Sequence, residues 1–196
     1  MNKAEARTNG LKNRNALTEA ERNEFNASIA RKVMDAVSSA KVIGCYVSFR
    51  QEADTHELIQ NLLHEGKQVT VPRTFPDHLE FHLISSLEEL KPGVWGIPEP
   101  DNDRIILPSE IDIMLVPLSS FDECCHRTGY GKGYYDRILP DCHLSIGLAY
   151  ECQKCDLIET DPWDQTLDRI ITESNVYQNQ DPDQGISIPH RHKDAG

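Results

Sequence analysis

The residue types best suited to chemistry are concentrated in one short segment, positions 127–137. It reads Arg-Thr-Gly-Tyr-Gly-Lys-Gly-Tyr-Tyr-Asp-Arg, with its glycines at alternate positions. Glycine lets neighbouring backbone N–H groups turn toward one point because no Cβ stands in the way, and such a group at a helix start binds phosphate oxygens. Arg127 and Lys132 bracket the first glycines and supply positive charge. The segment therefore predicts a phosphate-binding loop.

The spacing excludes the two best-known phosphate-binding sequences. A P-loop needs Ser or Thr after its Gly-Lys pair and four residues between its glycines, whereas Gly133 follows Lys132 here. A dinucleotide-binding fingerprint has another spacing and does not lie late in the chain. A simpler interpretation is a tight turn with solvated charges. That interpretation does not account for two cations, two tyrosines and an Asp-Arg pair in one loop.

The length and charge of the chain limit the classes of ligand and partner that this loop can bind. The chain has 196 residues and a formal net charge of −12, which fits one domain and lacks the basic surface that nucleic-acid binding needs. No apolar run approaches the ~20 residues that cross a bilayer, and the start is polar. We expect a cytoplasmic monomer or weak dimer without nucleic-acid or membrane partners. Because an acidic surface repels polyanions, the phosphate site must be built locally.

The cysteines give a weaker signal. Six are present, and Cys152 and Cys155 have the spacing of one half of a zinc site. No second half with matching spacing follows. The alternative, free thiols that are partly buried, is the interpretation that we favour.

The elements that must position the loop alternate along the chain. Helices are expected at 1–15, weakened by Asn9-Gly10, and after a Thr18–Glu21 capping box. A third follows a capping signal at 54–57, has its apolar face within 58–63 and stops at Gly66, and a fourth is expected at 132–139. Strands are expected at 41–49, 68–72, 79–84 (an edge strand), 111–118, 143–150 and 167–172. Segment 86–90 is a short helix at best, and 92–100 is a loop.

Strands that alternate with helices indicate a mostly parallel sheet covered on both faces. We therefore predict an α/β protein with three α/β/α layers, N-terminal helices and a single domain over residues 1–177. From Gln178 onward the chain is too polar to pack. Residues 178–196 are expected to form a disordered tail.

At this point the motifs become specific to one family. Phe121-Asp122, followed by the segment 127–137, resembles the signature of the 5-formyltetrahydrofolate cyclo-ligases, also called methenyltetrahydrofolate synthetases. The likeness extends over roughly residues 3 to 173. Its other parts are Lys3-x-x-x-Arg7, Val71-Pro72-Arg73, Trp95 with Gly96–Pro100, Trp163-Asp164, Asp168 and Thr172-Glu173.

The resemblance implies a ligase that uses ATP and Mg²⁺. ATP would phosphorylate the formyl oxygen on N5 of the folate, N10 would attack the activated carbon, and phosphate would leave as 5,10-methenyltetrahydrofolate forms. A formyl oxygen is a poor leaving group, and its phosphate ester is a good one. The protein would then position the reactants and neutralise charge.

The family motif also implies roles for individual residues. Lys132, Arg127 and Tyr134 would be catalytic, with Lys132 on the transferring phosphate. The nucleotide would be held by Lys3, Arg7, Arg127, Thr128, Gly129, Tyr130, Gly131, Lys132, Gly133, Tyr134 and Tyr135. Lys3 and Arg7 share one face of the first helix, although they also fit ordinary solvated charges.

The same motif implies a metal site and a folate slot. Asp136 and Asp164 match the magnesium ligands, the alternatives being a helix first-turn acid and a turn residue. Glu52 would accept hydrogen bonds from the pterin, or it is an exposed loop residue. The apolar slot would be lined by Val47, Phe49, Trp95, Tyr130 and Tyr134, although Val47 and Phe49 also fit a core.

Two departures from the family leave alternatives open. Cys125 stands where the family usually has Gly, and Thr128 where it usually has Leu. They are the support for a non-catalytic member that binds folate or nucleotide without turnover. A sugar-phosphate isomerase or CoA transferase would share the fold class, but no enolisation base or acyl-accepting Glu with a telling context is found.

Overall fold

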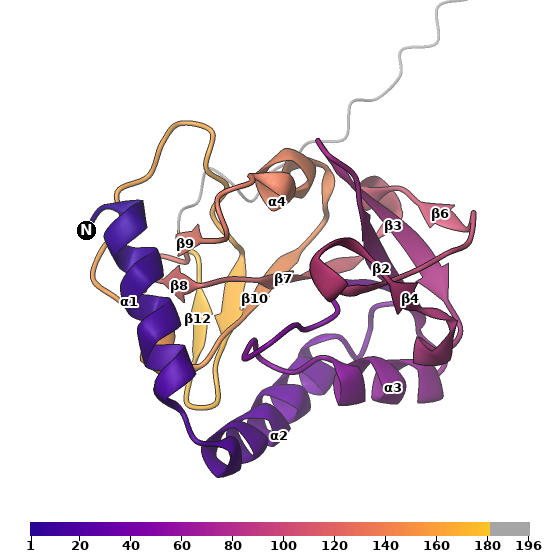
Figure 1. The fold of residues 1–196 in the computed structure, drawn as a ribbon, viewed down its shortest axis with the longest axis horizontal. Coiled ribbons are helices and arrows are strands. Elements are labelled where there is room, and N and C mark those ends of the chain that lie inside the picture. The colour runs from indigo at the N-terminus through magenta and orange to yellow at the C-terminus, as the bar shows by residue number, and fades with distance from the viewer. Residues whose placement is uncertain (181–196) are drawn as a thin grey trace, which may run out of the picture.

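A mixed β-sheet forms the centre of the computed structural model, which describes residues 1–180 (Figure 1). The tail predicted for 178–196 lies outside the described residues from position 181 on, and its first residue, Gln178, is instead paired with Arg169 in the sheet. Within the described part, eight strands form one sheet. In spatial order they are β12 (Val176–Gln178), β11 (Arg169–Ile171), β10 (Ser145–Leu148), β7 (Ile113–Pro117), β1 (Val42–Cys45), β2 (Gln68–Thr74), β3 (Leu79–Ile84) and β6 (Ile105–Ile106).

The central strands are parallel, as predicted. β11, β10, β7, β1 and β2 pair in parallel, and β12, β3 and β6 add antiparallel strands at the two sides. From β1 the chain proceeds to β2 on one side and later returns to β7 on the other. Connections therefore diverge at the carboxyl ends of β1 and β7, where ligands bind in open α/β sheets.

Helices on both faces give the predicted three layers. They are α1 (Lys3–Ala16), α2 (Glu19–Ala36), α3 (His56–His64) and α4 (Tyr134–Ile138). In Figure 1, α2 and α3 lie below the sheet and α4 above it. Ile29 and Val33 of α2 and Leu58 of α3 are buried in one core cluster, whereas Ile138 of α4 belongs to a second cluster with Phe121.

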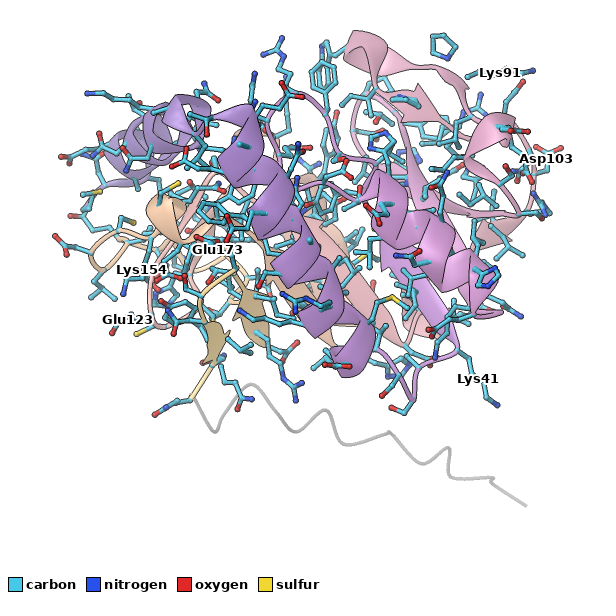
Figure 2. All side chains as sticks on the ribbon, turned by 90° about the horizontal axis from the view of Figure 1, so that it is seen from below. Lys41, Lys91, Asp103, Glu123, Lys154 and Glu173 are labelled. Carbon is cyan, nitrogen blue, oxygen red and sulfur yellow. The ribbon has the colours of Figure 1, made fainter. Side chains whose placement is uncertain are left out.

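Figure 2 looks onto the face that α2 and α3 cover. The labelled Lys154 and Glu123 lie at one end of this view, where their Nζ and Oε1 atoms pair at 2.7 Å. Lys91 and Asp103 lie at the opposite end. Charged side chains thus surround the molecule, while the apolar faces of the helices point to the sheet. Among residues 1–180, no helix combines the length and apolar content that crossing a membrane requires.

Several element boundaries differ from the prediction. The capping box of α2 is present, with Thr18 and Glu21 bonded as expected. The strand expected at 41–49 ends at Cys45, because side chains replace the strand partners beyond it. The Thr55 hydroxyl donates to the Tyr46 carbonyl (2.7 Å) and accepts from the Ser48 N–H (2.9 Å). Thr55 consequently makes no side-chain cap on α3, contrary to the predicted capping signal.

Short elements were missed. β3 has the predicted bounds but is not an edge strand, because β6 pairs with it. The loop expected at 92–100 contains part of a hairpin, β4 (Lys91–Pro92) with β5 (Pro98–Glu99). A second hairpin joins β8 (Ser120–Phe121) to β9 (Arg127–Thr128). The last predicted helix begins only at Tyr134, because Gly133 has a left-handed φ of +65°, and it gives way to a 3₁₀ turn at Leu139–Asp141 that contains Pro140.

Gly10 explains how α1 approaches the sheet. A Cβ on Gly10 would lie 2.1 Å from the Ser119 carbonyl oxygen, so only glycine permits this contact. The helix runs without interruption through Asn9-Gly10, and the expected weakening is offset by packing. This close approach brings the Lys3 and Arg7 face of α1 to the carboxyl end of β7.

Candidate functional site

A cavity of about 960 Å³ opens at the carboxyl ends of β1 and β7. Its walls come from α1, the segment after β1, the end of β2, the β4–β5 hairpin, the segment 127–137 and the turn at 163–164. It therefore lies at the topological switch point. All residues that the sequence analysis assigned to the site line it: Lys3, Arg7, Val47, Phe49, Glu52, Trp95, Arg127, Thr128, Gly129, Tyr130, Gly131, Lys132, Gly133, Tyr134, Tyr135, Asp136 and Asp164.

The glycine-rich loop forms one wall. Gly131 and Gly133 adopt left-handed φ angles of +87° and +65°, which other residues adopt only with strain. The Nε of Arg7 donates to the Gly129 carbonyl at 2.5 Å. A Cβ on Gly131 would lie 3.7 Å from the Arg7 guanidinium. Arg7, predicted as a nucleotide contact, thus fixes the start of the loop from α1.

Arg127 and Asp136 form a largely buried ion pair at the base of the loop. The Arg127 side chain is 6% exposed, and its Nη2 donates to Asp136 Oδ1 at 2.9 Å. Burial lowers the pKa of Arg127, and the charge of Asp136 opposes this shift. Within the described residues, the buried Nε of Arg127 has no hydrogen-bond partner. A buried cation with unused donor capacity suits an additional anionic ligand.

Lys3 joins α1 to the turn at 161–164. Its Nζ donates to both carboxylate oxygens of Asp164 (2.7 and 3.0 Å) and to Asp161. Burial alone would lower the pKa of Lys3, but the hydrogen bonds to Asp161 and Asp164 raise it. For Asp164, burial acts to raise the pKa, but the hydrogen bonds from Lys3 and the Asp161 N–H, together with the positive charges of Lys3 and Arg127, lower it overall. Lys3, predicted to contact the nucleotide, is thus hydrogen-bonded to Asp164, predicted to bind the metal ion.

Asp136 and Asp164 fit a magnesium ion. Both line the cavity. The hydrogen bonds that Asp136 accepts, from Arg127 and from the Gln165 N–H, both fall on Oδ1. Oδ2 is therefore left for another ligand in the described part of the chain. Two carboxylates beside a glycine-rich loop are a donor set that suits Mg²⁺, whose shell is usually completed by phosphate oxygens and waters.

Glu52, on the segment after β1, also lines the cavity and is not a freely exposed loop residue. Its Oε1 accepts from the Tyr130 hydroxyl and its Oε2 from the Phe49 N–H, each at 2.8 Å. Burial raises the pKa of Glu52, and these two bonds and the positive charge of Arg14 act against the rise. Val47, at 3% exposure, belongs to the core cluster and also lines the cavity, and its contact with a pterin stays a prediction.

Aromatic side chains stand at the mouth. Trp95 is 61% exposed and has a left-handed φ of +57°, an uncommon conformation for a large residue. Trp163, next to Asp164 in the chain, is 68% exposed. The Tyr134 hydroxyl donates to the Phe75 carbonyl at 3.0 Å and so ties the loop to the turn after β2. Exposed aromatic faces here can stack on flat rings of a ligand.

Sequence reasoning missed Arg14 and Asp161. Arg14 is 3% exposed and lines the cavity, with its Nη2 donating to the Tyr130 hydroxyl at 3.2 Å. Its position, seven residues after Arg7, places both on one helix face and was the available signal. Asp161 carried no such signal, because its partner Lys3 is far away in sequence.

The two departures from the family pattern leave the cavity intact. Cys125 takes a left-handed φ of +64° and is fully buried, so the turn that glycine would allow is formed at a cost in strain. The Thr128 hydroxyl contacts the hydroxyls of Ser119 (2.9 Å) and Ser120 (2.6 Å). The six cysteines are free thiols in the structure, and Cys124 lies with Asp122 and His126 in a group of possible metal ligands.

A mostly parallel sheet, a cavity at its switch point and a glycine-rich loop flanked by cations define an α/β enzyme. Residues 1–173 match the model of the 5-formyltetrahydrofolate cyclo-ligase family. The chain belongs to this family and is a ligase.

Individual relatives agree with this assignment. The 5-formyltetrahydrofolate cyclo-ligase of Escherichia coli K12 is 33% identical over 176 residues, which cover 84% of this chain and 97% of the relative. That of Haemophilus influenzae is 34% identical, covering 84% and 94%. The solved structure of Aquifex aeolicus 5,10-methenyltetrahydrofolate synthetase superposes with a TM-score of 0.82 at 30% identity, over 98% of this chain and 99% of that one.

Proposed function

We propose that this chain catalyses the ATP- and Mg²⁺-dependent cyclisation of 5-formyltetrahydrofolate to 5,10-methenyltetrahydrofolate, with release of ADP and phosphate. The observation that carries the proposal is one cavity with two differently equipped walls. One part of its lining is the glycine-rich loop with Arg7, Arg127 and Lys132, and another is the segment after β1, with the carboxylate of Glu52 near apolar side chains. Such a cavity can hold a triphosphate and a pterin next to each other.

The nucleotide would bind along the loop wall. Lys3, Arg7 and Arg127 would neutralise its phosphates, and the left-handed glycines would let the backbone approach them closely. Lys132 would lie against the transferring phosphate. Arg127 is suited to its part because it is already fixed by Asp136 and reorganises little when the ligand arrives.

Magnesium would be held by Asp136 and Asp164. When bound, the ion supplies positive charge to the phosphate oxygens and orients them for in-line transfer. Lys3 already donates a hydrogen bond to Asp164. The Asp164 carboxylate would therefore contact both Lys3 and the magnesium ion. Asp136 would offer the oxygen that Arg127 does not use.

The folate would bind on the Glu52 wall. Glu52 would accept hydrogen bonds from the amino and ring N–H groups of the pterin, with Val47, Phe49 and Trp95 around the ring. The formyl oxygen on N5 would attack the γ-phosphorus, and ADP would leave. N10 would then attack the formyl carbon, lose its proton, and expel the oxygen as phosphate. Tyr134, which is tied to Phe75, would lie between the two ligands.

The test is absorbance at about 360 nm, where the conjugated methenyl product absorbs, with purified protein, 5-formyltetrahydrofolate, Mg²⁺ and ATP. A rise that requires ATP and disappears in Lys132→Ala supports the proposal. Lys91→Ala is the matched control, because Lys91 is exposed and pairs with Asp101 outside the cavity. A flat trace from folded protein that binds both ligands would support a non-catalytic binding protein instead.

A further inference from the structure

Three side chains connect the two walls of the cavity. The hydroxyl of Tyr130 lies 2.8 Å from Glu52 Oε1 and 3.2 Å from Arg14 Nη2. Arg14 comes from α1, Tyr130 from the glycine-rich loop and Glu52 from the segment after β1. The chain of contacts therefore runs from the first helix through the loop to the opposite wall.

The direction of each hydrogen bond follows from the groups involved. A guanidinium can only donate, so the Tyr130 oxygen accepts from Arg14. The single hydroxyl hydrogen of Tyr130 is then available to Glu52, whose ionised carboxylate can only accept. The bond from Tyr130 to Glu52 is charge-assisted, and such bonds are stronger than neutral ones.

Arg14 is a fixed support for this arrangement. It is 3% exposed, and within residues 1–180 its Nε and Nη1 have no hydrogen-bond partner. A buried cation without an ion pair is costly unless a negative charge lies near. The positive charge of Arg14 acts to lower the pKa of Glu52, so the two groups attract each other, although burial of Glu52 outweighs this effect. Tyr130 thus stands between two opposite charges that hold it in place.

Tyr130 also controls the glycine-rich loop. It is flanked by Gly129 and by Gly131, whose φ is +87°, so the local backbone has few constraints of its own. Arg7 holds the Gly129 carbonyl, and the Tyr130 side chain holds the next residue against the opposite wall. Each Glu52 oxygen has a second lone pair, so a ligand can bond Glu52 while Tyr130 remains in contact.

We propose that Tyr130, supported by Arg14, is a positioning residue that couples the nucleotide side of the cavity to the Glu52 side, so that the two ligands bind with positive cooperativity. The inference rests on the proposed function for the identity of the ligands. A folate bound to Glu52 would add a partner to that carboxylate and, through the Tyr130 bond, reduce the remaining motion of the loop. The nucleotide then binds a loop that is already ordered, which lowers the entropy cost of its binding.

The test measures, by calorimetry, how tightly the protein binds the Mg²⁺ complex of a non-hydrolysable ATP analogue. The dissociation constant of this complex is determined with and without saturating 5-formyltetrahydrofolate. The folate constant is measured with and without the analogue, since coupling must be reciprocal. In the wild-type protein we expect an increase in affinity of about 10-fold, within the usual range of coupling. In Tyr130→Phe the factor should fall below about 2-fold, while each ligand still binds alone.

Two further variants complete the design. Tyr177→Phe also removes a phenol that contacts a carboxylate, that of Glu151, but outside the cavity, and it should retain the coupling. Arg14→Lys keeps the positive charge and a group that can donate to the Tyr130 hydroxyl. This variant should retain part of the coupling. Wild-type protein without coupling, or coupling unchanged in Tyr130→Phe, would overturn the inference and leave the proposed function standing. Failure of the wild-type protein to bind either ligand would overturn both.

Discussion

Glu52→Gln provides a test that separates binding from stability. Glutamine has the same shape, but only one oxygen replaces the two that accept from the Phe49 N–H and the Tyr130 hydroxyl. Its oxygen can keep the Phe49 bond, and its amide can donate to the Tyr130 oxygen. The pterin then meets a neutral group with less acceptor capacity. A hydrogen bond to a charged group contributes about 1.5–3 kcal/mol, so the folate dissociation constant should rise about 10- to 150-fold.

Stability should change in the opposite sense. Burial raises the pKa of Glu52 above its ordinary value, so the folded state disfavours the ionised form more than the unfolded state does. Below the ordinary carboxylate pKa both states are protonated and Glu52 costs nothing. As pH rises through the elevated pKa, the folded protein must ionise a buried group and loses stability. At pH 7.5 the melting temperature of Glu52→Gln should therefore equal or exceed that of the wild type, with the difference shrinking toward acidic pH.

The assays are fluorescence or calorimetric titration with 5-formyltetrahydrofolate and thermal unfolding between pH 5 and pH 8. Glu123→Gln is the matched control, because Glu123 is exposed, pairs with Lys154 and lies outside the cavity. It should change neither quantity. If Glu52→Gln bound folate normally, or melted more than about 4 °C below the wild type, which is at least about 1 kcal/mol for a chain of this size, Glu52 would be a structural residue and the reasoning would be refuted.

Three other substitutions test the remaining walls. Lys3→Met removes the cation that bonds Asp164 and should raise the KM for ATP about 10-fold or more, measured by product absorbance. Asp136→Asn should raise the Mg²⁺ concentration for half-maximal rate about 10-fold in the same assay. Gly10→Ala should lower the melting temperature by several degrees, because its Cβ would overlap the Ser119 carbonyl; overpacking costs about 1–3 kcal/mol, more than the helix propensity gained.

Each of these has a control. Lys12→Met, on an exposed position of α1, should leave the ATP KM unchanged. Asp103→Asn, far from the cavity, should leave the Mg²⁺ dependence unchanged. Asn9→Ala, exposed next to Gly10, should raise the melting temperature slightly. A normal ATP KM in Lys3→Met, an unshifted Mg²⁺ requirement in Asp136→Asn, or an unaltered melting temperature in Gly10→Ala would each contradict the corresponding contact.

Local sequence signals, such as capping residues and the spacing of apolar residues, made most of the fold predictable. The capping box at Thr18 and the apolar spacing of α2 are local signals, and the structure has both. The strand after Lys41 was predicted too long, because its sequence stays apolar past Cys45. Its partners there are the Thr55 hydroxyl and Glu52, and a local pattern cannot reveal such distant side-chain partners. Two-residue strands such as β8 and β9 are too short to show any period.

The candidate site was predictable where one motif carried it. The segment 127–137 and the face of Lys3 and Arg7 were found because neighbouring residues define them, and all line the cavity. Their roles toward ATP, Mg²⁺ and folate stay predictions, as do the cytoplasmic location, the oligomeric state and the domain boundary at 177. Arg14 was missed because its meaning depends on Tyr130, more than a hundred positions away.

The position of α1 has a consequence for synthesis of the chain. This helix leaves the ribosome before the residues that it packs against, because Gly10 meets Ser119, Arg7 meets Gly129 and Lys3 meets Asp164. At about 5–20 residues per second, α1 waits on the order of ten to thirty seconds before the last of these partners emerges. Only Ala6, Gly10 and Arg14 of the helix are buried in the finished protein. Because it carries so little apolar surface, the nascent helix can remain solvated during this interval without inviting aggregation.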